Sequence, residues 1–261
     1  MVRAGVAGAV VMAALLAAPF ERSRTDPFTR MPFVRIEAGS FLMGTPPGEP
    51  QREAQEVQHR VTIARPFYLA VHEVTQAEWM KVMGANPSHF QSCGGECPVE
   101  NVSYEDVLAF VTTLDSKSNW KGFRLPTEAE WEYACRAGSA KAFGPSDVLT
   151  TNDANFDGDY PVAGQPKGRN RRSTVPVGSF RPNAWGLYDM SGNVWEWTSD
   201  DYAPYPGASA PDTPAFTPRR KVIRGGSWLF GADSARCGLR YTHRPQDRGP
   251  SLGVRLAHDA E

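Results

Sequence analysis

Residues 138–220 limit most strongly how this chain can fold. The stretch is dominated by Gly, Pro, Asn, Asp and Ser, and few of its residues recur with helical or strand spacing. So long a segment without regular structure is uncommon inside a compact domain. We therefore expect a metal ion, aromatic packing or disulfides to fix it. The 24 glycines and 22 prolines among 261 residues likewise favour a loop-rich fold over a helical bundle.

Three segments carry a helix-start signature, with a hydroxyl residue followed three positions later by a carboxylate: Thr75–Glu78, Ser103–Asp106 and Thr127–Glu130. The first and third are full capping boxes, and the second, which ends in Asp, is a weaker version. The predicted helices are Gln76–Met83 ending at Gly84, one from Ser103 onward, and Glu128–Ala137 ending at Gly138. In the middle helix the expected apolar face consists of Tyr104, Val107, Leu108, Val111 and Leu114.

The predicted strands are short, and no domain boundary follows residue 33. We expect Phe33–Ile36 and Gly39–Gly44 to form a hairpin. Further strands are expected at Val61–Ile63, Phe67–Val71, Val222–Ile223 and Gly253–Ala257.

The first twenty residues differ from the rest of the chain. Arg3 precedes an uncharged, largely apolar run from Ala4 to Phe20, the pattern of a secretory signal peptide. An uncleaved N-terminal anchor, or a true start at Met31, are the alternatives. We therefore expect residues 1–20 to be a signal peptide or anchor, 21–32 a linker and 33–261 one domain, with the protein periplasmic or extracellular.

The four cysteines, Cys93, Cys97, Cys135 and Cys237, suit two disulfides in an oxidising compartment. Counting alone allows three pairings. Cys93 and Cys97 could close a local loop. Half a zinc site is the rival interpretation, but no second Cys pair or His pair accompanies them.

Charge and motif content exclude several classes of function. The net charge is −1, and no long Lys/Arg run is present, so nucleic-acid binding has no support. The five histidines are scattered, and we expect no iron site. There is no phosphate-binding loop and no nucleophile elbow.

Several long motifs, in a fixed order, resemble the formylglycine-generating enzyme, or sulfatase-modifying factor, family. They are Phe123–Cys135, Asn183–Trp197, Arg224–Trp228 and Gly253–Arg255, with Gly39–Gly44 and Glu73–Thr75 fitting as well. The resemblance runs from about Phe33 to Ala257. It implies a single α+β domain with little regular structure, related to C-type lectin folds.

The resemblance covers several activities, so it does not fix one. One branch oxidises a sulfatase cysteine to formylglycine with copper and oxygen, through two cysteines that follow the Gly-Gly-Ser motif. Here Phe230 stands at the first of these positions and the second has no counterpart, so copper is not expected. Cys237 matches a structural cysteine that the family pairs with the one at Cys135, which implies a Cys135–Cys237 disulfide beside Cys93–Cys97.

Part of the family pocket is retained. Ser227 and Arg240 match positions that line the substrate groove, and Trp195 matches a nearby aromatic. With Phe230 they form the candidate pocket. Arg240 would be an anion clamp or, alternatively, a structural tie between C-terminal loops.

Two calcium sites follow from the resemblance. The first would use Asp189, Glu196 and the carbonyls of Gly192 and Val194. A metal-free turn held by aromatic packing is the alternative. The second, weaker site would use Asn155, Phe156 and Asp157, but the chain has Arg169 where a further Asp is needed.

These features together predict an exported ligand-binding or accessory protein of the bacterial cell envelope, with calcium as a structural cofactor and an unknown ligand or protein partner. A membrane contact is expected only through the N-terminal segment. The alternative is an enzyme with different chemistry, such as an oxidoreductase that tailors a secreted small molecule or peptide. A sulfatase-activating enzyme and a retroelement variable protein are further alternatives.

Overall fold

The computed structural model describes residues 22–208 and 219–260. Three α-helices lie in these ranges: α1 (Gln76–Met83), α2 (Tyr104–Lys117) and α3 (Glu128–Arg136). Short 3-10 turns span Gln91–Cys93 and Ala232–Ala235. Residues 1–20, the predicted signal peptide or anchor, lie outside the described residues.

All three helices begin with a complete capping box. In α2 the Asp106 carboxylate reaches back to the Ser103 N–H at 2.8 Å, so the predicted weaker version is in fact reciprocal. α1 ends at Gly84 in the left-handed region, as predicted. α3 ends one residue earlier than predicted, because Ala137 itself adopts the left-handed conformation with φ of 46°.

The buried face of α2 differs from the predicted one. Val107, Phe110 and Leu114 are buried, whereas Leu108 is exposed. Phe110 stacks on Trp79 of α1, with ring centroids 4.6 Å apart. This stacked pair rotates the apolar stripe of α2 toward α1.

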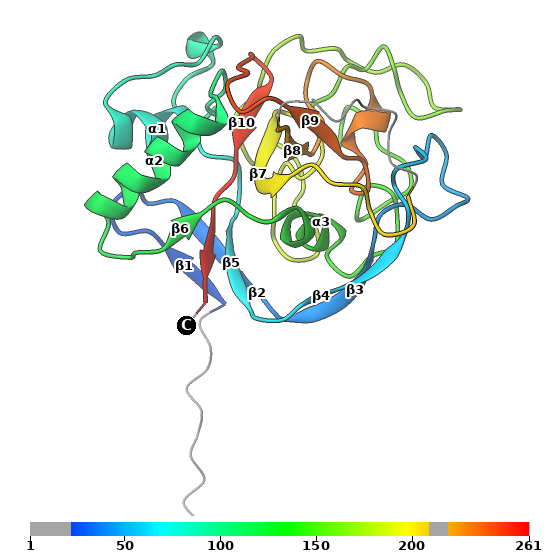
Figure 1. Cartoon of the computed structure of the whole chain (residues 1–261). Helices are drawn as coiled ribbons and strands as arrows, with labels where there is room; N and C mark the ends of the chain where they lie inside the picture. Colours follow the sequence, from blue (N-terminus) through cyan, green and yellow to red (C-terminus); the bar gives the residue numbers. More distant parts are fainter. Residues whose placement is uncertain (1–21, 209–218, 261) are drawn as a thin grey trace, which may run out of the picture.

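A five-stranded sheet has the order β1-β2-β5-β11-β6. Its C-terminal strand β11 lies between β5 and β6, and the red end of the chain can be followed there in Figure 1. All strand pairs in this sheet are antiparallel among the described residues. The strands are β1 (Ser23–Thr25), β2 (Pro32–Ile36), β5 (Phe67–Ala70), β6 (Phe123–Arg124) and β11 (Ala257–Asp259).

The prediction of a linker over residues 21–32 is wrong. β1 pairs with β2, and Met31 and Asp26 are fully buried. The Ser118 hydroxyl donates a hydrogen bond to Asp26, and Asp26 in turn accepts from Thr29. The segment therefore belongs to the domain.

A second sheet has the order β10-β7-β8-β9, in which β10 and β7 are parallel. Its strands are β7 (Trp195–Asp201), β8 (Lys221–Arg224), β9 (Tyr241–His243) and β10 (Leu252–Val254). β3 (Gly39–Met43) pairs only with β4 (His59–Ile63) among the described strands. The predicted hairpin is thus wrong, because β2 pairs with β1 and β5 instead of β3.

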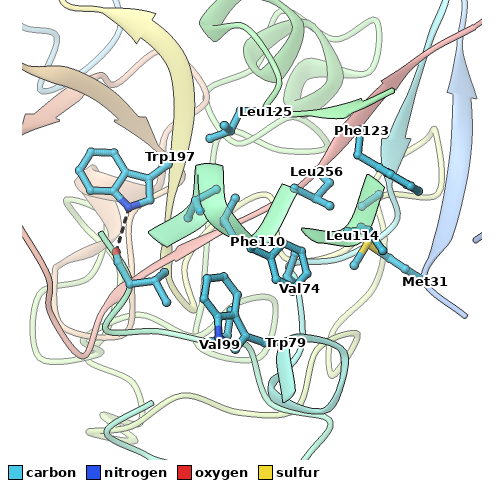
Figure 2. Close-up of a cluster of buried hydrophobic side chains, with 14 of the residues drawn as sticks. Met31, Val74, Trp79, Val99, Phe110, Leu114, Phe123, Leu125, Trp197 and Leu256 are labelled. Atoms are coloured by element: carbon cyan, nitrogen blue, oxygen red, sulfur yellow. Dashed lines mark hydrogen bonds between the residues drawn. The ribbon is translucent and has the colours of Figure 1, made fainter. Parts of the chain in front are cut away.

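The largest apolar cluster joins the two sheets and the first two helices (Figure 2). Within it the Trp197 indole N–H donates to the Val102 carbonyl at 3.0 Å. This hydrogen bond satisfies the polar group of a fully buried side chain.

From Ala137 to Val194 the chain forms no helix or strand, as predicted, but β7 (Trp195–Asp201) lies inside the stretch 138–220 in which little regular structure was expected. A smaller cluster that includes Phe143, Leu149 and Phe156 packs this loop against the 3-10 turn at Ala232–Ala235. The Cys135–Cys237 disulfide connects the end of α3 to the segment after that turn. Within the described ranges, no helix is both long and apolar enough to cross a lipid bilayer.

Candidate functional site

Strand β7 separates two groups of candidate functional residues, one on each of its faces. Successive side chains of a strand point to opposite faces. Trp195 and Trp197 accordingly belong to the main apolar cluster, whereas Glu196 between them contacts Arg255 and Trp131. Trp195 of the predicted pocket and Glu196 of the predicted metal site therefore lie on opposite sides of one strand.

On the tryptophan side, three exposed apolar residues form what we call the aromatic face: Leu229, Phe230 and Tyr241. Phe230 is 41% and Tyr241 52% exposed. Both rings lie against Trp195, with centroid distances of 5.8 Å. The buried Trp195 thus forms the floor of an exposed apolar surface.

The Trp195 indole N–H has no hydrogen-bond partner among the described residues, although the side chain is 2% exposed. A buried polar group without a partner is unusual and needs an explanation. Ser227, also predicted for the pocket, is fully buried, and its hydroxyl accepts from the Leu229 N–H at 3.4 Å. The structure therefore brings Trp195 and Phe230 together, with Ser227 beneath the turn that carries Phe230.

Arg240 does not join the aromatic face. It is 2% exposed, and its guanidinium makes a double hydrogen bond to Glu128, at 2.9 and 2.7 Å. It also donates to the Ala203 carbonyl and covers the Tyr205 ring at 3.9 Å. This geometry favours the predicted structural tie over the anion clamp.

Glu128 belongs to a buried series of alternating charges that we call the arginine chain. Arg240 pairs with Glu128, which lies 3.5 Å from Arg224, and Arg224 pairs with Glu132. Arg136 closes the series on Glu132 at 2.8 Å. Burial alone would lower the pKa of Arg224, but the facing Tyr205, Glu132 and Glu128 raise it above its usual value. The arginine chain fastens α3 to β8 and to the segment that leads into β9.

All four cysteines of the chain form disulfides, Cys93–Cys97 and Cys135–Cys237, as predicted. The family resemblance predicts that Phe230 stands at the position of the first copper cysteine. A copper site of this family needs two thiolates, because these soft ligands select Cu(I). The residues present do not fit that group.

On the other side of β7, three carboxylates face one arginine, a group that we call the acidic cluster: Glu73, Asp189, Glu196 and Arg255. Arg255 donates to both oxygens of Glu196, at 2.8 to 3.1 Å, and Trp131 donates to the same carboxylate at 2.6 Å. Glu73 accepts from the Val194 N–H and from Asn193. These bonds hold the predicted metal loop in its turn.

The acidic cluster has one positive charge for three acids. Burial raises the pKa of Glu73, and the charges of Asp189 and Glu196 raise it further, to well above its usual range. Burial likewise raises the pKa of Asp189. One Asp189 oxygen accepts from the Gly178 N–H at 2.7 Å, while the other is buried without a partner.

The cluster fits calcium in part. Hard cations take several oxygens, and the unpartnered Asp189 oxygen is such a donor. The Glu196 oxygens already accept from Arg255 and Trp131. No three His, Cys, Asp or Glu side chains of the described residues converge as metal ligands; the predicted site needs only two, together with two carbonyls.

The second acidic loop is held by protein groups. Asn155 donates to Ser173 and Asn193, and its oxygen is buried without a partner. Phe156 is buried, and Asp157 accepts from Asn170 at 2.6 Å. Arg171 donates to the Thr151 carbonyl at 2.7 Å, so a side-chain cation already lies beside this loop.

Sequence reasoning missed Glu73, Arg255 and Tyr241 as site residues. Glu73 and Arg255 stand in two of the motifs that carry the family resemblance, Glu73–Thr75 and Gly253–Arg255, and this was the available signal. Nothing in the sequence around Tyr241 indicates that it contacts Trp195.

The fold and the motifs agree with known proteins. Residues 19–260 match the model of the sulfatase-modifying factor enzyme 1-like domain. The chain is 30% identical to the formylglycine-generating enzyme of Bos taurus, over 90% of this chain and 76% of that protein. It is 32% identical to the chaperone protein LppX of Paenibacillus barcinonensis, over 73% of this chain and 79% of that one.

Solved structures agree as well. Treponema denticola variable protein 1 is 27% identical with a TM-score of 0.76, over 93% of this chain and all of the other. PvdO from Pseudomonas aeruginosa is 32% identical with a TM-score of 0.72, over 91% and 98%. These neighbours bear out the expected α+β, C-type-lectin-like fold.

Proposed function

The chain belongs to the sulfatase-modifying factor, or formylglycine-generating enzyme, family, and on that premise we propose that it is an exported ligand-binding or accessory protein of the cell envelope. It does not oxidise sulfatase cysteines. One observation carries this proposal: every cysteine is in a disulfide, and Phe230 stands where the copper thiolate would be.

The chemistry explains the weight of that observation. Cysteine oxidation in the family requires a metal that holds the substrate thiolate and activates oxygen. A disulfide sulfur is not a thiolate ligand, and a phenyl ring offers no lone pair. Phe230 instead contributes apolar surface, together with Leu229 and Tyr241.

An exposed aromatic surface of this kind suits binding. Aromatic side chains are enriched in the central residues of protein interfaces. One relative, LppX, is a chaperone by name, which supports a non-catalytic role. We propose that the ligand or partner contacts the exposed rings of Phe230 and Tyr241, which lie against the buried Trp195.

The test is a peptide with a Cys-x-Pro-x-Arg core, incubated with purified protein, Cu(I), oxygen and a reductant. We expect no loss of about 18 Da by mass spectrometry, the mass change from thiol to aldehyde; a relative with both copper cysteines is the positive control. Turnover that survives replacement of all four cysteines would overturn the proposal. Turnover that depends on Cys93 or Cys97 would instead refute the assignment of these residues to a structural loop.

A second candidate is an enzyme with different chemistry. The unpartnered Trp195 N–H is the observation that favours it, because such a donor could hold a reacting oxygen once the side chains that cover it move apart. Untargeted metabolite profiling with the purified protein tests it. A product that disappears in the Trp195→Phe variant would favour the enzyme over the binding protein.

Export and calcium are proposals as well. A fusion of residues 1–20 to a reporter enzyme that is active only outside the cytoplasm tests export. Replacing Arg3, or introducing a charged residue into the apolar run, should reduce the reporter activity.

For calcium, we propose binding at the acidic cluster through Asp189, Glu196 and the carbonyls of Gly192 and Val194. Metal analysis of the purified protein measures it.

A further inference from the structure

A cavity of about 320 Å³ lies away from both the aromatic face and the arginine chain, beside the Cys135–Cys237 disulfide. Its apolar wall comes from buried side chains of two loops that meet at the end of α3: Phe143, Leu149, Leu187 and Met190. Val148, which is 40% exposed, lies at the opening. None of these five residues takes part in the site described above, although Asp189 of the acidic cluster also lines the cavity.

The size of the cavity limits what it can hold. An apolar cavity of about 150 Å³ accommodates benzene. About twice that volume holds one aromatic ring with a short chain attached. Ligand pockets are generally apolar, with a few polar groups that fix orientation.

The polar groups that line the cavity are mostly occupied. The Asn183 oxygen accepts from Trp185 and Leu187, and Ser191 donates to the Ala235 carbonyl. Of the two lining carboxylates, Asp153 accepts from Thr150, and one oxygen of Asp189 accepts from Gly178 while its other oxygen has no partner. Apart from that oxygen, these groups are committed to holding the loops in place.

Arg181 is different. It lines the cavity and is exposed, and its guanidinium makes no hydrogen bond or ion pair to any described residue. A guanidinium presents two parallel donors that match a carboxylate. The cavity therefore combines an apolar interior with one uncommitted cation at its edge.

We propose that this cavity binds a small aryl carboxylate, with the ring among Phe143, Leu149 and Met190 and the carboxylate on Arg181. The site goes beyond the proposed function and does not depend on it.

The experiment is a calorimetric titration of the full chain with 3-phenylpropanoate and with the neutral 3-phenylpropan-1-ol, at pH 7 and low salt. We expect saturable one-to-one binding of the acid, about tenfold tighter than the alcohol, which corresponds to one charge-assisted contact. In R181Q the two ligands should bind equally, at the affinity of the alcohol. R169Q, another exposed arginine, is the matched control and should bind as the unmodified chain does.

A second pair of variants tests the place of binding. V148W adds a large ring at the opening and should abolish binding of both ligands. L229W adds the same ring on the aromatic face and should change neither affinity. The proposal is overturned if the acid does not saturate at millimolar concentration, if R181Q keeps the preference for the acid, or if V148W binds as tightly as L229W.

Discussion

The arginine chain and the acidic cluster are both buried sets of charges, but their balance is opposite. The arginine chain has three guanidiniums for two carboxylates, and each carboxylate contacts two cations. The acidic cluster has one guanidinium, that of Arg255, for three carboxylates. Most of the hydrogen bonds of this guanidinium go to Glu196. The first set neutralises its acids without outside help, whereas the second needs protons or a cation.

The largest expected effect comes from removing the arginine of the acidic cluster. Arg255→Gln leaves three buried acids without a cation, and we expect a loss of about 3–5 kcal/mol in the free energy of unfolding. Arg224→Gln should cost less, about 1–3 kcal/mol, because Arg136 and Arg240 still pair with the two glutamates. Urea unfolding measures both. An equal or larger loss for Arg224→Gln would contradict the comparison.

When one acid of each set is neutralised instead, we expect the larger loss of stability in the arginine chain. Glu132→Gln leaves Arg136 and Arg224 facing each other, and we expect a loss of about 3 kcal/mol. Glu73→Gln removes an acid whose pKa is already raised, so the loss should be about 1 kcal/mol, for one weakened hydrogen bond. Thermal unfolding at pH 7 compares them. A greater loss for Glu73→Gln would mean that this carboxylate is not in excess.

Calcium should act on the acidic cluster alone. At a concentration 100-fold above its dissociation constant it should add about 2.7 kcal/mol, and a chelator should reverse the gain. The gain should increase with pH, because calcium and protons compete for the same acids. Asp189→Gly removes the side-chain ligand and tolerates the φ of 56°, so it should abolish the response. Asp157→Gly, in the second loop, is the control, and a response lost in that variant would move the site there.

Glu78 tests the effect of burial on a carboxylate that has no neighbouring arginine, and the expected change in stability is smaller. Its carboxylate caps α1, and burial raises its pKa to about 7. The folded state then holds a proton that the unfolded state releases near pH 4.5, so stability should fall as the pH rises from about 5 through 7. The slope is at most about 1.4 kcal/mol per pH unit for one proton. Glu78→Gln should flatten it, and an unchanged slope would assign the titration to another group.

The sequence predicts the local parts of this fold well. The capping boxes at Thr75, Ser103 and Thr127 need only residues within one turn, and all three form. Strand partners were harder to predict, because β2 pairs with β1 and β5 through main-chain bonds that leave no mark on side-chain pattern. β1 also lies in a short polar stretch that is typical of a linker.

In the candidate site, too, the sequence predicts some features, whereas others depend on long-range contacts that it does not reveal. The sequence predicts that the copper thiolates are absent, because Phe230 stands at the first of their expected positions. The family motifs also predict the long-range disulfide Cys135–Cys237, which forms. The partner of Arg240 was not visible, since Glu128 lies 112 residues away in the chain. The unpartnered Trp195 N–H depends on how β9 and the turn before Phe230 pack, which no local pattern encodes.

The place of β11 has a consequence for how the protein is made. Residues 257–259 lie between β5 and β6, so the sheet begun by residues 23–36 remains open until the last strand is synthesised. Contacts between such distant parts of a chain slow folding. The nascent polypeptide should therefore stay incompletely folded until β11 is made, and a truncation before Ala257 should leave β5 paired with β2 only, with its other edge open and prone to aggregate.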